Sequence, residues 1–513
     1  MRSLLKAGWQ RLELALDRAF SPGANPLRQL GALGWFCYWV VLGSGIYLYI
    51  FFDTGLEQAY ASVARLSENQ WYAGGIMRSL HRYASDALVL IVALHLLREL
   101  VHDRLHGARA FTWITGVVLI GFLYVSGITG YWIVWDRLAQ YAAIATMEWL
   151  DALPFFAVPV ARNFLHAGTL SGRFFTLFCF IHIAVPLFML FCMWLHIQRL
   201  AQPRVNPPRE LALGSMVMLL GAAWLSPATS QGPADLSTVP TVINLDWFYF
   251  LFYPVLDRLS GAAAWGVAAA GASLLIALPW LTPRLAAQPA AAHVDLPNCN
   301  GCGRCVQDCP FSAVTLGQRT DGLPYAEQAV VDADLCVGCG ICVGACPTAT
   351  PFRRHSNLIA GIELPDFPLI QLRDAVDKTF AADPSGARIL VFRCAHGPAS
   401  SDPDREVAAI TLPCIGQLPP PFIDYTLSRG HANGVILAGC AQNACYERLG
   451  QQWTQQRMGR TRDPKLRQRV PADRVIACWA GRDAGSVTAA VATLRNRLLQ
   501  PMAPGEKQPC IAG

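Results

Sequence analysis

The chain has 513 residues, of which 53% are hydrophobic and 15% charged, and its formal net charge is +6. A soluble globular protein carries roughly a quarter charged residues, so this composition, with a mean hydropathy of +0.32, excludes a wholly soluble chain. The modest positive charge is dispersed and gives no indication of a nucleic-acid partner. Eight of the 17 cysteines lie in tight metal-ligand runs, which favours reduced thiolates in a cytoplasmic compartment over the disulfides of a secreted protein.

The N-terminal segment MRSLLKAGWQRLELALDRAF predicts an amphipathic helix at a membrane interface rather than a cleaved signal peptide. Apolar segments long enough to cross a membrane follow at 29–52, 80–101, 112–135, 174–197, 211–228 and 262–281. If the N-terminus is cytoplasmic, the cytoplasmic connections hold 11 Lys and Arg in 56 residues, against 7 in 101 residues for the outer ones. The positive-inside rule therefore predicts a multi-pass protein of the bacterial cytoplasmic (inner) membrane, with all residues after 284 in the cytoplasm.

Two histidine pairs share one spacing. His81 and His95 lie 14 residues apart in one span, and His182 and His196 lie 14 apart in another. Fourteen residues are close to four helical turns, so each pair falls on nearly one helix face, roughly 21 Å apart along the axis at about 1.5 Å per residue. A single buried histidine is more often an ordinary packed residue. The repeated interval, however, predicts two opposed imidazole pairs, which is the geometry of two bis-histidine haems.

Glycines repeat the same interval in two other spans. Gly31 and Gly45 are 14 residues apart in the first span, and Gly116 and Gly130 are 14 apart in the third. Glycine permits close backbone approach because it has no Cβ, so these positions are predicted to make room for haem. Ordinary packing of small residues between helices is the alternative for any one of them.

Residues 1–285 resemble the cytochrome b of cytochrome bc and b6f complexes. The matching stretches are GGIMRSLH…ALHLLR, WITGVVLIGFLYVSGITGYWIVW and FFTLFCFIHIAVPLFMLFCMWLHIQRLAQPRVNPP. The resemblance implies one b-type haem near the outer face on His81 and His182, and one near the cytoplasmic face on His95 and His196. It also implies that Arg78 and Arg98, each three residues from a ligand, pair with haem propionates; arginines that reach to the membrane surface are the alternative.

The same family carries Pro-Glu-Trp-Tyr beside its outer quinol-oxidation site, where this chain reads Leu245-Asp246-Trp247-Phe248. Asp246 keeps a carboxylate that could accept a quinol proton, and it is the candidate catalytic residue of an outer quinone site. The sequence contains no Cys-x-x-Cys-His motif, so no c-type haem is expected.

After a Pro/Ala-rich linker at 283–298, eight cysteines form two runs, each ending in Cys-Pro. This is the pattern of two-cluster bacterial ferredoxins, in which the fourth cysteine of each run crosses to the other cluster. The spacing predicts two 4Fe-4S sites, with a structural zinc site as the alternative. Their ligands would be Cys299, Cys302, Cys305 and Cys346 for the first site, and Cys336, Cys339, Cys342 and Cys309 for the second.

Beyond residue 355, short apolar segments alternate with helical ones. ARILVFRC, EVAAITLPC, GVILAGC and DRVIACWA predict parallel strands, and PFIDYTLSRG and VTAAVATLRNRLLQ predict helices, as in an α/β domain. Cysteines end several of these strands, where parallel sheets bind ligands. We expect a four-thiolate site of Cys394, Cys414, Cys440 and Cys445, with buried structural cysteines as the alternative and His396 as a substitute ligand.

The stretch LPCIGQLPPPFIDYTLSRGHANGVILAGCAQNACYERLGQQWTQQR resembles the delta (iron-sulfur) subunit of methyl-viologen-reducing hydrogenase. That resemblance implies a 2Fe-2S cluster on the four cysteines and electron exchange with a heterodisulfide-reductase flavoprotein.

Together these features predict an all-α transmembrane bundle of about six helices (1–285), a small α+β two-cluster ferredoxin domain (286–355) and an α/β parallel-sheet domain (356–513). We expect a quinone-linked oxidoreductase subunit that joins a cytoplasmic dehydrogenase or flavoprotein to the quinone pool. Two alternatives remain. One is quinol-driven reverse transfer in a flavin-bifurcating assembly, and the other is a non-catalytic electron conduit without a quinone site. The cytochrome b resemblance also implies a homodimer.

Overall fold

The computed structural model describes residues 2–153, 172–198, 200–283, 289–379, 387–398, 406–442, 444–481 and 483–499. Its contacts divide the chain into two compact units, each of which is described by itself. The helical unit contains Met1–Trp9, Gln29–Gln198 and Pro203–Pro283. The cysteine-rich unit contains Gln10–Arg28, Arg199–Gln202 and Arg284–Gly513.

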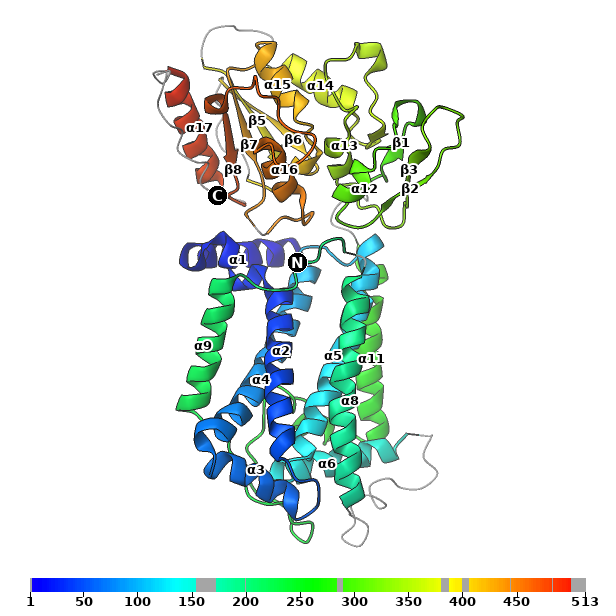
Figure 1. Ribbon diagram of the computed structural model, residues 1–513. Coiled ribbons are helices and arrows are strands. Elements are labelled where there is room, and N and C mark those ends of the chain that lie inside the picture. The colour runs from blue at the N-terminus through cyan, green and yellow to red at the C-terminus, as the bar shows by residue number, and fades with distance from the viewer. Residues whose placement is uncertain are drawn as a thin grey trace. The chain divides into compact units, whose positions relative to one another are not determined.

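Every predicted span falls on a helix (Figure 1). The long helices are α1 (Arg2–Ala24), α2 (Leu30–Phe51), α4 (Ile76–Val101), α5 (Ala110–Trp132), α8 (Gly172–Ile197), α9 (Arg209–Leu225) and α11 (Gly261–Leu281). Shorter ones are α3 (Gln58–Glu68), α6 (Arg137–Asp151) and α10 (Tyr253–Leu256). The all-α architecture predicted for this region is thus confirmed.

By length and apolarity, four stretches of the described chain are suited to cross a membrane: Leu30–Phe51, Gly107–Trp132, Phe175–Ile197 and Gly261–Leu281. The remaining two predicted spans are helical but differ from these four in charge or in length. Helix α4 carries charged side chains along its length, and α9 has only 17 residues. Ionisable residues inside an apolar bundle are costly and usually functional, so α4 is where chemistry is expected.

Two helix pairs organise the helical unit. Helix α2 packs along α4, and α5 packs along α8, while α9 contacts α4 and α11 contacts α5 and α6. Aromatic and apolar side chains fill the space between them, among them Tyr38, Leu88, Trp132 and Phe175. Each pair therefore joins a glycine-bearing helix to a histidine-bearing one.

The cysteine-rich unit begins with a small α+β part. Strand β1 (His293–Val294) pairs antiparallel with β4 (Ile362–Glu363), and β2 (Val314–Gln318) pairs antiparallel with β3 (Glu327–Val331). Two five-residue helices, α12 (Arg304–Asp308) and α13 (Ile341–Ala345), each follow the second cysteine of a run. Since β4 lies beyond residue 355, the strand pairing of this part extends past the boundary expected from the sequence.

The α/β part contains a parallel sheet in the order β6-β5-β7-β8, formed by β5 (Ile389–Cys394), β6 (Val407–Leu412), β7 (Gly434–Ala438) and β8 (Val475–Cys478). Side chains alternate between its faces, as a strand period of two requires. Ile389 and Val391 pack with α17 (Ala484–Leu499), whereas Leu390 and Phe392 pack with α15 (Pro421–Ser428) on the other face. The remaining helices are α14 (Leu369–Lys378) and α16 (Gly450–Met458).

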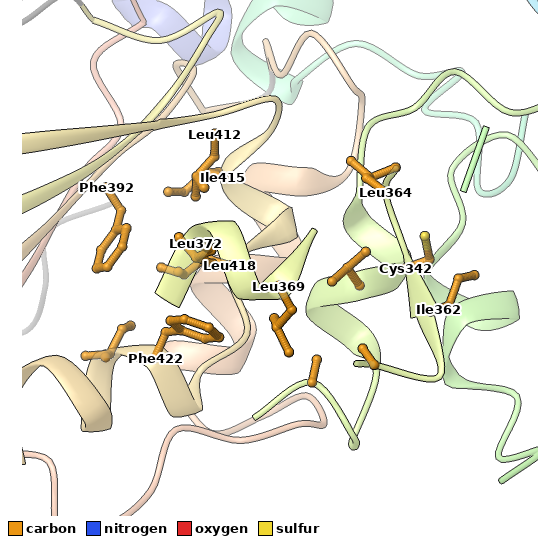
Figure 2. Packing of buried hydrophobic residues seen from close by; sticks show 14 of the residues in the cluster. Cys342, Ile362, Leu364, Leu369, Leu372, Phe392, Leu412, Ile415, Leu418 and Phe422 are labelled. Atoms are coloured by element: carbon orange, nitrogen blue, oxygen red, sulfur yellow. The ribbon is translucent and has the colours of Figure 1, made fainter. Parts of the chain in front are cut away.

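One hydrophobic core joins the α+β and α/β parts of this unit. Figure 2 shows Cys342, Ile362 and Leu364 of the former in the same cluster as Leu372 and Phe422 of the latter. Each fully buried large apolar side chain contributes about 1.5–3 kcal/mol. The two parts are therefore held together by burial as well as by the polar contacts described below.

Candidate functional site

The spacing of one histidine pair fits a shared metal ion. His81 of α4 and His182 of α8 face each other with ring centroids 6.2 Å apart. Two imidazoles on one metal ion, with metal–nitrogen bonds of about 2.0–2.1 Å as in zinc sites, hold their centroids about 6 Å apart. The pair is therefore spaced for an iron between the two rings.

Hydrogen bonds orient both rings for this role. The Nδ1 atom of His81 lies 2.9 Å from the carbonyl oxygen of Val41, and that of His182 lies 2.9 Å from the carbonyl oxygen of Ser126. A carbonyl only accepts, so in each ring Nδ1 carries the proton and donates it. Each Nε2 atom then keeps its lone pair, which is the arrangement of a histidine ligand with its outer-shell partner in place.

The other histidine pair has a comparable environment. His95 and His196 lie within electrostatic range of each other, and Nδ1 of His196 is 3.0 Å from the Thr115 hydroxyl. That hydroxyl donates to the carbonyl of Phe111 at 2.9 Å, so it is free to accept from the ring. The same tautomer follows for His196.

All four predicted glycines face histidine rings on the neighbouring helix. A Cβ atom at Gly31 would lie 3.6 Å from Cε1 of His95, and one at Gly45 would lie 3.0 Å from Cε1 of His81. Likewise, a Cβ atom at Gly116 would lie 3.2 Å from Cε1 of His196, and one at Gly130 would lie 2.7 Å from Cε1 of His182. The glycines thus make room for the imidazole rings of the four histidines, which adds to the expectation that they make room for haem.

The two predicted propionate arginines differ in their partners. Arg78 donates to the hydroxyls of Ser67 at 2.6 Å and Ser230 at 2.7 Å. Arg98 already lies 3.4 Å from the carboxylate of Glu99. Because the hydrogen-bond partners of Arg78 are neutral hydroxyls, whereas Arg98 pairs with a carboxylate, Arg78 is the better suited of the two to bind a further carboxylate.

Asp246 lies in a buried network rather than at an open surface. Its Oδ1 accepts from the backbone N–H groups of Phe248 and Tyr249 at 2.9 and 3.0 Å. Its Oδ2 accepts from the hydroxyl of Tyr131 and lies 3.3 Å from Arg82, and the side chain is 2% exposed. The carboxylate therefore caps a turn and neutralises an arginine.

A second carboxylate adjoins this network. Asp86 of α4 is buried, with one oxygen 4.0 Å from the guanidinium of Arg82. Sequence reasoning did not single out Asp86, Arg82 or Tyr131. The signal was available, because charged residues within a predicted span are themselves candidate functional positions.

The structure brings the eight ferredoxin-type cysteines together in the two predicted sets. One cavity is lined by Cys299, Cys302, Cys305 and Cys346, and a second is lined by Cys309, Cys336, Cys339 and Cys342. Each cavity therefore takes its fourth cysteine from the other run, as a two-cluster site requires.

Local backbone geometry sets up both cavities. Gly303 and Gly340 precede α12 and α13 in the left-handed region, with φ of 70° and 75°, where a side chain would be strained. The backbone N–H of Ala313 lies 3.2 Å from Sγ of Cys309, and that of Ala292 lies 3.4 Å from Sγ of Cys336. Such N–H···S contacts stabilise thiolates and tune cluster potentials.

The wide spacing of the cysteines within each set suits an iron-sulfur cubane. In the described part of the chain, no three His, Cys, Asp or Glu side chains converge closely enough for one metal ion. In a cubane each cysteine binds a different iron, so its ligands are further apart than those of a single zinc.

Four cysteines also converge at one edge of the α/β sheet. Cys394 ends β5, Cys414 follows β6, Cys440 follows β7, and Cys445 lies in the next loop. The Sγ atoms of Cys394 and Cys440 are 3.9 Å apart, and neighbouring thiols interact around a ring that includes all four residues. Hydrogen bonds from Cys414 and Cys440 hold the pKa of the Cys394 thiol well below its usual range. His396, the expected substitute ligand, stacks on Tyr446 with ring centroids 3.6 Å apart.

A buried ionic network between the α+β and α/β parts was also not foreseen. Arg457 is fully buried and pairs with Asp308, which also pairs with Arg462 and accepts from Trp453 Nε1 through its carbonyl oxygen. Asp308 and Arg457 are 149 residues apart, and although each lies in a stretch quoted above, neither motif indicates that the two side chains pair.

Three families match the chain in sequence order. Cytochrome b/b6/petB matches residues 16–203, the 4Fe-4S dicluster domain matches 298–350, and the methyl-viologen-reducing hydrogenase delta subunit matches 396–500. The cytochrome b6 of Trichodesmium erythraeum (strain IMS101) is 28% identical over 191 residues, which are 36% of this chain and 84% of that protein.

Among solved structures, a hyperthermophilic respiratory Complex III is similar over 50% of this chain and 75% of its own, with 17% identity and a TM-score of 0.42. The family matches carry the conclusion: in N-to-C order the chain combines a helical cytochrome b-like region, a 4Fe-4S dicluster region and a hydrogenase delta-subunit-like region, and it is a membrane electron-transfer protein.

Proposed function

We propose that the chain carries electrons between a cytoplasmic dehydrogenase or flavoprotein and the quinone pool. The partner would exchange electrons with the four-cysteine site of the α/β part, which we assign to a 2Fe-2S cluster. Two 4Fe-4S sites and two bis-histidine haem sites would complete the path. Bound haems and iron-sulfur clusters supply reversible one-electron transfer.

The facing imidazoles of His81 and His182, with centroids 6.2 Å apart, are the observation that carries this proposal. Each ring has its Nδ1 proton held by a backbone carbonyl and its Nε2 free. The glycines against the rings fix the imidazole positions from the opposite helix. This arrangement supports the proposal that the membrane helices take part in electron transfer and are not merely an anchor for the cysteine-rich unit.

Four thiols in a ring support a binuclear iron site. Neighbouring sulfur atoms interact in pairs, and no point lies within bonding reach of three metal-binding side chains among the described residues. A single zinc ion needs such a point, whereas a 2Fe-2S cluster binds two cysteines at each of two irons. The match of residues 396–500 to the methyl-viologen-reducing hydrogenase delta-subunit family suggests the class of partner, a hydrogenase-linked or flavin-containing reductase.

The charge asymmetry of the connecting segments supports a cytoplasmic location for the cysteine-rich unit in a bacterial inner membrane. A homodimer is part of the same proposal, by analogy with cytochrome b. A molecular mass for the purified complex that accommodates only one copy of the chain would reject the dimer and leave the electron path untouched.

A second candidate is an electron conduit without a quinone site. It is favoured by Asp246, whose two oxygens already accept four hydrogen bonds in a buried network. In that case the chain delivers electrons to another membrane or outer protein.

Quinone reduction by the purified protein separates these functions. The whole protein, reduced anaerobically with dithionite, is mixed with a water-soluble quinone analogue while haem oxidation and quinol formation are followed. We expect both to proceed together. Haems that reduce but never pass electrons to quinone would reject the quinone link and retain the conduit, and the absence of iron-sulfur EPR signals would reject the electron path.

A further inference from the structure

Helix α13 of the dicluster region makes unusually close contact with the α/β part. A Cβ atom at Gly344 would lie 2.0 Å from the carbonyl oxygen of Gly416, and one at Gly416 would lie 2.9 Å from Cα of Gly450. A Cβ atom at Gly450 would in turn lie 2.2 Å from Sγ of Cys414. These three glycines bring the backbone that carries Cys342 against the backbone that carries Cys414.

The side chains at this contact form a small buried cluster. Ile341, Cys414, Leu449 and Trp453 pack together, and Cys339 packs against them. Ile341 is fully buried and lies between Cys339 and Cys342 in sequence. We name the contact of Ile341, Gly344, Gly416 and Gly450 the glycine junction. At this junction Cys414 of the α/β site and Cys339 of one 4Fe-4S site pack in the same buried cluster, with Ile341 beside both.

A buried cation holds this junction in place. The guanidinium of Arg457 donates to the carbonyl oxygen of Gly416 at 2.9 Å and to that of Ile341 at 3.4 Å. It also pairs with Asp308, the residue before Cys309. Arg457 therefore ties together three segments that carry cysteine ligands, and we regard it as a positioning residue.

The other 4Fe-4S site lies on a different side of the dicluster region. Its cavity is completed by Leu316, Ala329 and Ile362, all from the α+β part, and Cys302 is exposed. Cys305 of this site lies within electrostatic range of Cys342. The site of Cys309, Cys336, Cys339 and Cys342 therefore lies next to both the α/β site and the site of Cys299, Cys302, Cys305 and Cys346.

We propose, on the basis of the function proposed above, that the three sites work in a fixed order through the glycine junction. One electron leaves the site of Cys394, Cys414, Cys440 and Cys445 and reduces the site of Cys309, Cys336, Cys339 and Cys342. It then reaches the site of Cys299, Cys302, Cys305 and Cys346. Each step moves one electron from a reduced cluster to an oxidised one, with no proton and no bond change. The exposed Cys302 end is the outlet toward a one-electron acceptor outside this unit.

Magnetic coupling between reduced clusters tests the order. Neighbouring paramagnetic clusters speed each other's relaxation, so the EPR signal of the α/β site in the fully reduced protein should be hard to saturate with microwave power. Cys339→Ser and Cys302→Ser are matched variants, because each replaces the second cysteine of its run. We expect Cys339→Ser to give a slowly relaxing, isolated 2Fe-2S signal and Cys302→Ser to leave relaxation fast.

The opposite pattern, or relaxation unchanged in both variants, would overturn the order while the proposed function stands. A wild-type protein whose α/β site gives no 2Fe-2S signal would overturn that cluster assignment, and the order with it. If Cys339→Ser does not accumulate, Cys336→Ser and Cys299→Ser, the first cysteines of the two runs, form a second pair with the same expected results.

Discussion

At the scale of single residues, the helical unit relies on glycines as much as on histidines. The positions of the four histidines could be predicted from their spacing, because an interval of 14 residues returns to nearly the same helix face. The glycines follow the same interval, yet their contact with the imidazole rings depends on how α2 pairs with α4 and α5 with α8. That pairing is a property of the folded bundle.

Replacing Gly130 by alanine tests this relation. The added methyl would lie 2.7 Å from Cε1 of His182, so the ring must shift, at a cost of about 1–3 kcal/mol for overpacking. We expect a lowered haem content or an altered spectrum of one haem. Gly121→Ala in the same helix is the control, because nothing lies within 4 Å of its Cβ position. Equal haem spectra in the two variants would contradict a role for Gly130 in placing the ligand.

Asp246 offers a second test at this scale. Asp246→Asn keeps an oxygen for the backbone N–H groups of Phe248 and Tyr249 but loses the charge opposite Arg82. If Asp246 accepts quinol protons, quinol oxidation on the outer side should be lost while both haems remain. Asp257→Asn is the control, since Asp257 is exposed and also lies near a tyrosine hydroxyl. Unchanged turnover in Asp246→Asn would restrict Asp246 to a structural role.

At the scale of elements, we expect the short helices of the dicluster region to depend on bound iron-sulfur clusters. Helices α12 and α13 have five residues each, and isolated helices shorter than about 12 residues are marginal in water. Binding of iron and sulfide by the flanking cysteines therefore contributes to folding.

Removal of iron should accordingly unfold this region. We expect treatment with an iron chelator and oxidant to lower the helical circular dichroism and to make the segment around residues 299–346 accessible to protease. The helical unit provides an internal control, because its haem absorption should persist under the same treatment. Full protease resistance of the cluster-free protein would show that the cysteine runs fold without metal.

The strands and helices of the α/β part were predictable because each is a short apolar run bounded by turn residues. The cysteines at the carboxyl ends of β5, β6 and β7 followed from the same pattern, since parallel strands end at a common edge. The contact of this part with the dicluster region was not predictable. It depends on Gly344, Gly416 and Gly450, which look like ordinary loop and helix glycines in the sequence.

The pairing of Arg457 with Asp308 should stabilise this contact. Arg457→Met removes a fully buried cation and leaves part of a buried carboxylate uncompensated, which costs about 3–5 kcal/mol. The loss of stability should lie near the lower end of this range, because Arg462 still pairs with Asp308. The iron-sulfur absorption should therefore be lost at a lower temperature than in the wild type.

Arg495→Met is the control for this variant, because Arg495 and its partner Glu406 are partly exposed and such pairs contribute at most about 1 kcal/mol. Equal thermal midpoints for Arg457→Met and the wild type would mean that the network does not stabilise the junction.

At the scale of the whole molecule, the chain joins two kinds of redox site on separate compact units. The sequence indicates both kinds, because histidine intervals and cysteine runs are local patterns. It does not indicate that the dicluster and α/β parts share one core, since that depends on contacts between residues far apart in the sequence, such as Gly344 and Gly416. The sharing matters for function, because it fixes the distance between two of the three cysteine sites.

The most direct test of the electron path is haem reduction by electrons that enter through the cysteine-rich unit. The oxidised protein is mixed rapidly and anaerobically with its native reduced donor, and the haem α-band is followed in the wild type and in Cys339→Ser. We predict fast haem reduction in the wild type and a large fall in rate in the variant, with dithionite still reducing the haems of both. Equal rates of donor-driven haem reduction in the two proteins would contradict a path through the iron-sulfur sites.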